Sequence, residues 1–331
     1  MLNILVLGSG AWGCALANLL ADNKNNVTIY GIDENEISDI NNNHLNNKYF
    51  NDVKLNENIK ATNDLDASLS NIDLIVLAIP SFAIKEMVLK IKNRINKNTI
   101  IVNVAKGFDE ESKKPLANVI KDNLDKEYKG NVVSLLGPTF ASEVIIKQYT
   151  AITVSGEDIK ILKKVQSIFS NGYFRVYITK DYIGAEYCAA LKNVIALASG
   201  MVEGQGLKNN TKAALITRGL AEIMRFVKYF NGKEKTCFGL AGVGDLMLTC
   251  SSTTSRNYSA GYFIGKNNAS LFFKENKKTV EGVFACKIAY KIANDNNIYA
   301  PIVTSVYNVL FNNSNVKDEI DKLMSNDLKE E

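Results

Sequence analysis

The sequence predicts an α/β fold with a doubly wound, mostly parallel sheet, followed by an all-helical C-terminal domain. Three observations lead to this prediction. Apolar runs alternate with helical patterns through the first 180 residues, a glycine-rich turn joins the first run to the first helical pattern, and only the 3.6-residue period continues after residue 180. A chain of 331 residues is too long for a domain with one ordinary hydrophobic core, so we expect two domains, 1–180 and 181–331.

Short apolar runs predict the strands of the first domain, at residues 2–7, 27–32, 72–79, 99–104, 132–136, 151–154 and 173–178. Helical patterns lie between them, at residues 11–20, 84–91, 113–124 and 159–169. Residues 34–63 are polar and rich in asparagine, and no element is predicted there. Tyr49-Phe50 is their one aromatic pair, and it either anchors a loop or covers a bound cofactor.

A glycine-rich turn follows the first predicted strand. Gly8, Gly10 and Gly13 occur in the order of strand, turn and helix that the Rossmann-type dinucleotide fingerprint requires. Gly8 permits the tight turn, Gly10 lets the backbone approach a pyrophosphate, and Gly13 allows close packing of helix on strand. Asp33 follows the second strand and can accept hydrogen bonds from ribose hydroxyls. The alternative is a glycine turn that binds no ligand, but glycine in all three positions favours a dinucleotide.

Helical patterns fill the second domain, at residues 182–201, 210–230, 280–294, 302–312 and 316–324. The first of these helices is crowded with glycine and alanine, so it can pack closely against its neighbours, and Lys192 lies in its middle. Residues 239–250 are too rich in glycine and too apolar for an ordinary linker. Ser255 is the predicted N-cap of a further helix. The charged tail after Met324 is expected to be mobile.

Composition narrows the function classes. The net charge of +4 is small and dispersed, which argues against nucleic-acid binding and suits a small anionic substrate. No apolar run reaches the length of a membrane span and no signal peptide is recognised, so a cytoplasmic location is expected. Five scattered cysteines without a C-x-x-C pair predict core residues and no metal site. His44 is the only histidine and is expected in a solvated loop, so any general acid or base must be another residue type.

Hydride transfer from a dinucleotide to a substrate carbonyl needs an acid for the developing alkoxide, cations or hydrogen-bond donors that hold the substrate, and exclusion of water. Because the one histidine is expected in a loop, lysine is the natural acid. Lys192 would be partly desolvated on its apolar helix. Lys106 follows a predicted strand at the carboxyl edge of the sheet, and a nearby cation would lower the pKa of Lys192. Asp245 is a candidate to hold that ammonium, and residues 255–257 at a helix N-terminus suit a phosphate or carboxylate. Taken singly, each of these has a structural interpretation. Lys192 can be a lysine that extends to solvent, Asp245 can cap a turn, and residues 255–257 can be a simple helix cap.

Eight segments in order match one known family: Gly8–Gly13, Ala105–Gly107, Gly137–Glu143, Leu191–Asn193, Ile216–Leu220, Gly242–Cys250, Ser255–Asn257 and Val280–Gly282. Through them the whole chain resembles the NAD(P)-dependent glycerol-3-phosphate dehydrogenases of the bacterial type. The resemblance implies reversible reduction of dihydroxyacetone phosphate to sn-glycerol 3-phosphate for glycerophospholipid biosynthesis, with NAD(P)H as cofactor and Lys192 as general acid and base.

The resemblance also implies the remaining site residues. Those expected to contact the substrate are Lys106, Gly137, Thr139, Lys192, Asp245, Ser255, Arg256 and Asn257. Those expected to contact the cofactor, with the fingerprint glycines and Asp33, are Ala11, Trp12, Tyr49, Lys106, Ala141, Arg256 and Glu281.

One departure concerns the cofactor. Many bacterial relatives carry histidine or arginine just after the second strand, whereas this chain has Asp33-Glu34 there and no basic residue between Val27 and Asn43. We therefore expect a preference for NADH. Two alternatives remain at this point: a related hydroxy-acid dehydrogenase of the same two-domain plan, and a redox-sensing regulator without turnover. A homodimer is expected because the helical domain is strongly apolar.

Overall fold

A computed structural model of the protein describes residues 1–325. The chain divides into two compact units, Met1–Tyr182 and the residues from Ile183 onward. The charged tail that the sequence predicts to be mobile lies, apart from Ser325, outside the described residues. Each unit is described below by itself.

Eight strands form one sheet in the first unit, in the order β3-β2-β1-β4-β5-β6-β7-β8. All neighbouring strands are parallel except β6 and β7, so the doubly wound, mostly parallel sheet is confirmed. Between β1 and β4 the chain changes the direction in which strands are added, and ligands of such sheets bind at this point. The strands are β1 Asn3–Leu7, β2 Asn26–Tyr30, β3 Lys60–Thr62, β4 Leu74–Leu77, β5 Ile100–Asn103, β6 Val132–Leu136, β7 Thr150–Ser155 and β8 Phe174–Thr179.

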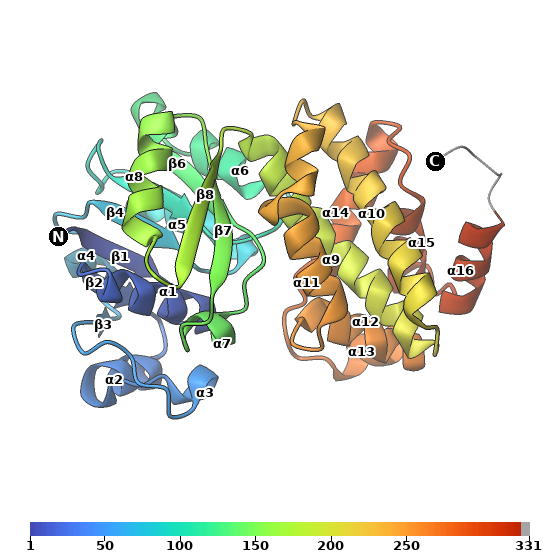
Figure 1. Ribbon diagram of the computed structural model, residues 1–331, viewed down its shortest axis with the longest axis horizontal. Coiled ribbons are helices and arrows are strands. Elements are labelled where there is room, and N and C mark those ends of the chain that lie inside the picture. The colour runs from blue at the N-terminus through green and yellow to red at the C-terminus, as the bar shows by residue number, and fades with distance from the viewer. Residues whose placement is uncertain (326–331) are drawn as a thin grey trace. The chain divides into compact units, whose positions relative to one another are not determined.

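Two helix layers cover the sheet (Figure 1). Side chains alternate across a strand, so Ile4 and Val6 of β1 pack with α1 and α8, whereas Leu5 and Leu7 pack with α5 and α6. The helices of this unit are α1 Ala11–Asp22, α2 Glu34–Asn43, α3 Asn47–Phe50, α4 Leu65–Ser68, η1 Ser81–Ala83, α5 Ile84–Ile91, α6 Leu116–Asp122, η2 Lys126–Asn131, α7 Ala141–Val144 and α8 Ile159–Phe169.

The polar residues 34–63, for which the sequence predicted no element, form α2, α3 and β3. Asparagine supports this structure, because the Asn41 side chain both donates to and accepts from the backbone of Ala61, at 2.8 Å each. His44 is not a solvated loop residue as predicted. It ends α2 in the left-handed conformation, is only partly exposed, and its buried Nδ1 has no hydrogen-bond partner among the described residues.

The second unit is helical throughout its described residues. Its elements are α9 Tyr182–Gly204, which starts one residue before the unit boundary, α10 Asn209–Tyr229, η3 Glu234–Phe238, η4 Leu240–Gly244, α11 Asp245–Ser251, α12 Arg256–Lys266, α13 Ala269–Glu275, α14 Glu281–Asp295, α15 Pro301–Phe311 and α16 Val316–Met324. The short α13 was not predicted. Within residues 1–325, no helix combines the length and the hydropathy that a membrane span needs.

Helix α9 is the buried centre of the second unit, since every residue from 184 to 202 is buried. Glycines bring α12 against it. A Cβ on Gly200 or Gly204 would overlap the backbone of α12, and a Cβ on Gly261 or Gly265 would overlap the backbone of α9. Small residues at this spacing let two helix backbones approach closely. The predicted close packing is confirmed, and it positions the N-terminus of α12. All five cysteines are buried free thiols.

Candidate functional site

The glycine turn has the geometry of a phosphate cradle. Gly8 has φ +120°, and a Cβ there would overlap the carbonyl oxygen of Ala78. A Cβ on Gly13 would overlap the carbonyl oxygen of Gly8, so helix α1 packs directly on the turn. Gly10 differs, because a Cβ there would meet nothing within 4 Å. Among the described residues no side chain caps the N-terminus of α1, and such a helix end suits an anion.

Residues of α2 and α3 form one wall of this cradle. The Asn46 side chain donates to the carbonyl oxygen of Ser9 at 2.9 Å, and the Ser9 hydroxyl donates to the buried carboxylate of Glu36. The Asn46 contact holds the start of α3, and with it the half-exposed ring of Tyr49, beside the glycine turn, and the Glu36 contact holds α2 there. Sequence reasoning missed Asn46 and Glu36, which stand within the polar stretch where no element was predicted.

Asp33 caps α2, and its carboxylate forms an ion pair with Lys48 at 2.9 Å. Lys48 also contacts Glu36 at 2.6 Å. The hydrogen bonds that Lys48 donates to Glu36 and then to Asp33 raise the pKa of Lys48, and the bond from Lys48 lowers the pKa of Asp33. The structure thus brings a cation to the end of β2, although the sequence has none between Val27 and Asn43.

A second group of predicted residues gathers at the same edge of the sheet. The carbonyl oxygen of Gly137 accepts hydrogen bonds from Lys106 Nζ at 3.1 Å and from Thr139 Oγ1 at 3.3 Å. Lys106 follows β5 and Gly137 follows β6, so neighbouring parallel strands place them together. Ala141 begins α7, which packs against α1, and its side chain contacts the same core cluster as Ala11 and Trp12.

In the second unit, Lys192 lies at the middle of α9 with only 5% of its surface exposed. Its Nζ is 2.5 Å from Oδ1 of Asp245, which is 1% exposed, and 2.7 Å from Thr249 Oγ1. The Thr249 hydroxyl donates to the carbonyl oxygen of Asp245 at 2.6 Å. Asp245 begins α11, and Thr249 follows one helical turn later on the same face. Gly242 in the preceding turn has no room for a Cβ beside the backbone of Cys237.

A chain of buried amides links three predicted segments of this unit. The Asn257 side chain donates to Asn193 Oδ1 at 3.0 Å and accepts from the backbone N–H of Gly282 at 2.8 Å. It therefore joins the residue after Lys192 to the start of α14, where Glu281 is the first residue. A Cβ on Gly282 would crowd the backbone of Asn193.

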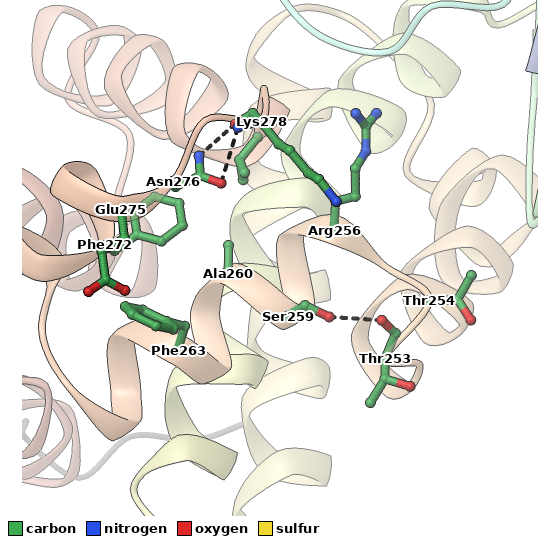
Figure 2. Close-up of a pocket in the computed structure, with 11 residues that line it drawn as sticks. Thr253, Thr254, Arg256, Ser259, Ala260, Phe263, Phe272, Glu275, Asn276 and Lys278 are labelled. Carbon is green, nitrogen blue, oxygen red and sulfur yellow. Dashed lines mark hydrogen bonds between the residues drawn. The ribbon is translucent and has the colours of Figure 1, made fainter. Parts of the chain in front are cut away.

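The start of α12 has the predicted N-cap, because the Ser255 side chain accepts from the backbone N–H of Tyr258 at 3.2 Å. Arg256 is exposed, and its guanidinium donates to the carbonyl oxygen of Thr279 at 3.4 Å. It lines a hollow of about 460 Å³ whose apolar part includes Phe263 and Phe272. Figure 2 shows the Arg256 side chain extending away from these two rings.

Sequence reasoning placed Lys192 with Asp245 correctly but did not identify Thr249 or Asn193 as parts of the site. Thr249 could have been found, since it stands four residues after Asp245 and a helix brings such pairs to one face. Asn193 lies within a matched segment, but its contact with Asn257 depends on how α9 and α12 pack.

Comparisons with known proteins agree along the whole chain. Residues 3–162 match the family described as NAD-dependent glycerol-3-phosphate dehydrogenase N-terminus, and residues 181–321 match its C-terminus. A Staphylococcus haemolyticus protein named glycerol-3-phosphate dehydrogenase [NAD(P)+] is 39% identical over 100% of both chains. The structure of glycerol-3-phosphate dehydrogenase from Coxiella burnetii has a TM-score of 0.90 at 31% identity and covers 98% of each chain. That from Plasmodium falciparum has a TM-score of 0.90 at 26% identity, covering 99% of this chain and 97% of its own.

Proposed function

This chain belongs to the NAD-dependent glycerol-3-phosphate dehydrogenase family, and on that premise we propose how its residues divide the reaction. The family reaction is reduction of dihydroxyacetone phosphate to glycerol 3-phosphate with NAD(P)H. The observation that carries our assignment is the buried Lys192 ammonium, which Asp245 and Thr249 hold at the centre of the helical unit. A regulator without turnover has no need for such a costly buried pair.

We assign dinucleotide binding to residues 1–180. The open space at Gly10 and the uncapped N-terminus of α1 suit the pyrophosphate, and Asp33 suits the ribose hydroxyls. Ala11, Trp12, Tyr49 and Ala141 are the further contacts we expect. NADH is the preferred cofactor, because Asp33 and Glu34 disfavour a 2′-phosphate. When bound, the cofactor supplies the hydride that C2 of the substrate receives.

We assign substrate binding and proton transfer to residues 181–331. Arg256 is the main phosphate ligand, because it is exposed and its guanidinium can bind phosphate in a bidentate manner. The Ser255 and Asn257 side chains are engaged in the hydrogen bonds that shape α12 and α14, so they support Arg256 and add donors at the helix N-terminus. The remaining expected substrate contacts are Lys106, Gly137 and Thr139 of the first unit. The remaining expected cofactor contacts are Lys106, Arg256 and Glu281.

Lys192 donates a proton to the substrate oxygen as the alkoxide develops, and it removes that proton in the reverse reaction. Asp245 holds the ammonium in place and stabilises its charge within a buried site, and Thr249 limits the direction in which the ammonium points.

We further propose that the enzyme works in the cytoplasm as a homodimer. Exposed aromatic side chains of the helical unit, such as Phe273 and Phe311, support this proposal, and analytical ultracentrifugation would measure the oligomeric state.

Substitution Lys192→Ala tests the assignment. We expect kcat for dihydroxyacetone phosphate to fall about 1,000-fold, because a general acid contributes roughly 100- to 10,000-fold. Binding of NADH should stay within about threefold of wild type, since Lys192 lies outside the glycine turn. Fluorescence of Trp12, the only tryptophan, reports that binding from within the turn. Lys266→Ala, an exposed lysine at the end of α12, is the matched control. A near-normal kcat in Lys192→Ala would remove Lys192 from this role.

A further inference from the structure

The ribose end of the proposed cofactor site holds an unusual balance of charge. Three carboxylates, Asp33, Glu34 and Glu36, stand just after β2, and one ammonium, that of Lys48, comes back to them from α3. The cation is 15 residues away from Asp33 in sequence and 2.9 Å away in space. The sequence pattern alone therefore overstates how acidic this end of the sheet is.

The two carboxylates that hold Lys48 differ. Glu36 is 7% exposed, and both the Ser9 hydroxyl and Lys48 contact it, so its position is set by the glycine turn. Asp33 is 34% exposed and also caps α2 through the N–H groups of Asn35 and Glu36. Lys48 itself is 54% exposed. Glu36 thus anchors the ammonium at the ribose end, whereas its contact with Asp33 faces solvent and can be exchanged for another anion.

We propose that Lys48 is a specificity-determining residue for the dinucleotide and is the group that allows this acidic ribose end to accept a 2′-phosphate. The proposal rests on the assignment of the dinucleotide to this glycine turn. With NADH, the Asp33 carboxylate accepts hydrogen bonds from the ribose hydroxyls, and Lys48 neutralises the charge of that carboxylate. With NADPH, the Lys48 ammonium stays on Glu36 and exchanges Asp33 for the phosphate.

Charge explains why this arrangement still favours NADH. One ammonium among three carboxylates leaves two net negative charges, which repel a 2′-phosphate but not a hydroxyl. Loss of Lys48 leaves three net negative charges, because it removes the only cation identified at this point among the described residues. The penalty should therefore fall mainly on NADPH, and a neutral residue in place of Asp33 should favour NADPH.

The test measures Kd for NADH and for NADPH by quenching of Trp12 fluorescence, in the wild type and in Lys48→Gln, Lys48→Arg and Asp33→Asn. In Lys48→Gln we expect Kd for NADPH to rise about tenfold or more, and Kd for NADH to change less than about threefold. Lys48→Arg should retain NADPH binding because it keeps the cation. Asp33→Asn should lower Kd for NADPH and raise Kd for NADH. Lys163→Gln, an exposed lysine on α8, controls for loss of one positive charge.

Three results would overturn the proposal. The first is equal weakening of NADH and NADPH binding in Lys48→Gln while circular dichroism shows a folded protein, which would make Lys48 a structural residue. The second is unchanged NADPH binding in that variant. The third is a wild type that binds NADH but does not bind NADPH at millimolar concentration. A wild type that binds neither dinucleotide would instead contradict the assignment of the cofactor to this turn.

Discussion

Thr249 gives the Lys192 ammonium its second fixed neighbour. Its hydroxyl receives a hydrogen bond from Nζ and passes one to the carbonyl oxygen of Asp245, so a single side chain ties the lysine to the first turn of α11. An ion pair alone leaves an ammonium free to rotate about its carboxylate. The hydroxyl restricts that rotation, and a proton donor must be oriented well to act on one substrate oxygen.

Thr249→Val keeps the shape of the side chain and removes only this hydroxyl. We expect kcat to fall about 10- to 100-fold with little change in KM, because an unsatisfied buried polar group costs about 1–3 kcal/mol and the loss affects the orientation of the proton donor. Steady-state kinetics with dihydroxyacetone phosphate measures both constants. Thr249→Ser, which keeps the hydroxyl, should recover most of the rate. Equal activity in the valine and serine variants would show that the hydroxyl plays no part.

Among the helices, α10 and α15 are joined by a buried carboxyl. Glu222 of α10 is buried, and it accepts hydrogen bonds from the backbone N–H groups of Ile302 at 2.6 Å and Val303 at 3.2 Å. Pro301, the first residue of α15, has no N–H, so the first two N–H groups at this helix end are those that Glu222 accepts hydrogen bonds from. Burial raises the pKa of Glu222 to about 7, against the lowering effect of those two hydrogen bonds.

This raised pKa predicts the pH dependence of stability. The folded protein binds a proton at Glu222 more tightly than the unfolded chain does, so the free energy of unfolding falls as pH rises from about 4.5 towards 7. The fall from this one group is at most about 3 kcal/mol. Urea unfolding at several pH values in this window should show a smaller fall for Glu222→Gln than for wild type. Glu275→Gln, at an exposed site on α13, should keep the wild-type dependence. Parallel curves for all three proteins would contradict the prediction.

Elements with a strong apolar pattern were predictable, and those held by polar side chains were not. The strands β1, β4, β5 and β6 are buried on both faces, so each appears as a mostly apolar run, with Ser134 as the one polar residue inside β6. In contrast, α2 begins at a cap from Asp33 and β3 is held by Asn41, which are contacts that no periodicity reveals. The same limit applies to the site: glycine spacing predicts the turn, but Lys48 and Asn46 reach it only through the fold of residues 34–63.

At the scale of the whole molecule, the chain divides into two compact units, and the glycine turn belongs entirely to the first. The pairing of Lys192 with Asp245 belongs to the second. Ligand binding stabilises the folded state of whatever it contacts, by about 2.7 kcal/mol at a hundredfold excess over Kd. NADH should therefore raise the unfolding temperature of the first unit, by about 5–10 °C for a domain of this size.

Two glycine substitutions distinguish cofactor binding from folding. Gly10 has φ −68°, and a Cβ there would meet nothing within 4 Å, so Gly10→Ala should fold with wild-type stability but fill the space that the pyrophosphate needs. Gly13→Ala should lower the unfolding temperature even without cofactor, because its Cβ would overlap the backbone of Gly8. Differential scanning calorimetry with and without NADH should show the cofactor-induced rise in wild type and its loss in Gly10→Ala. If Gly10→Ala keeps the full rise, the cofactor does not lie against this turn.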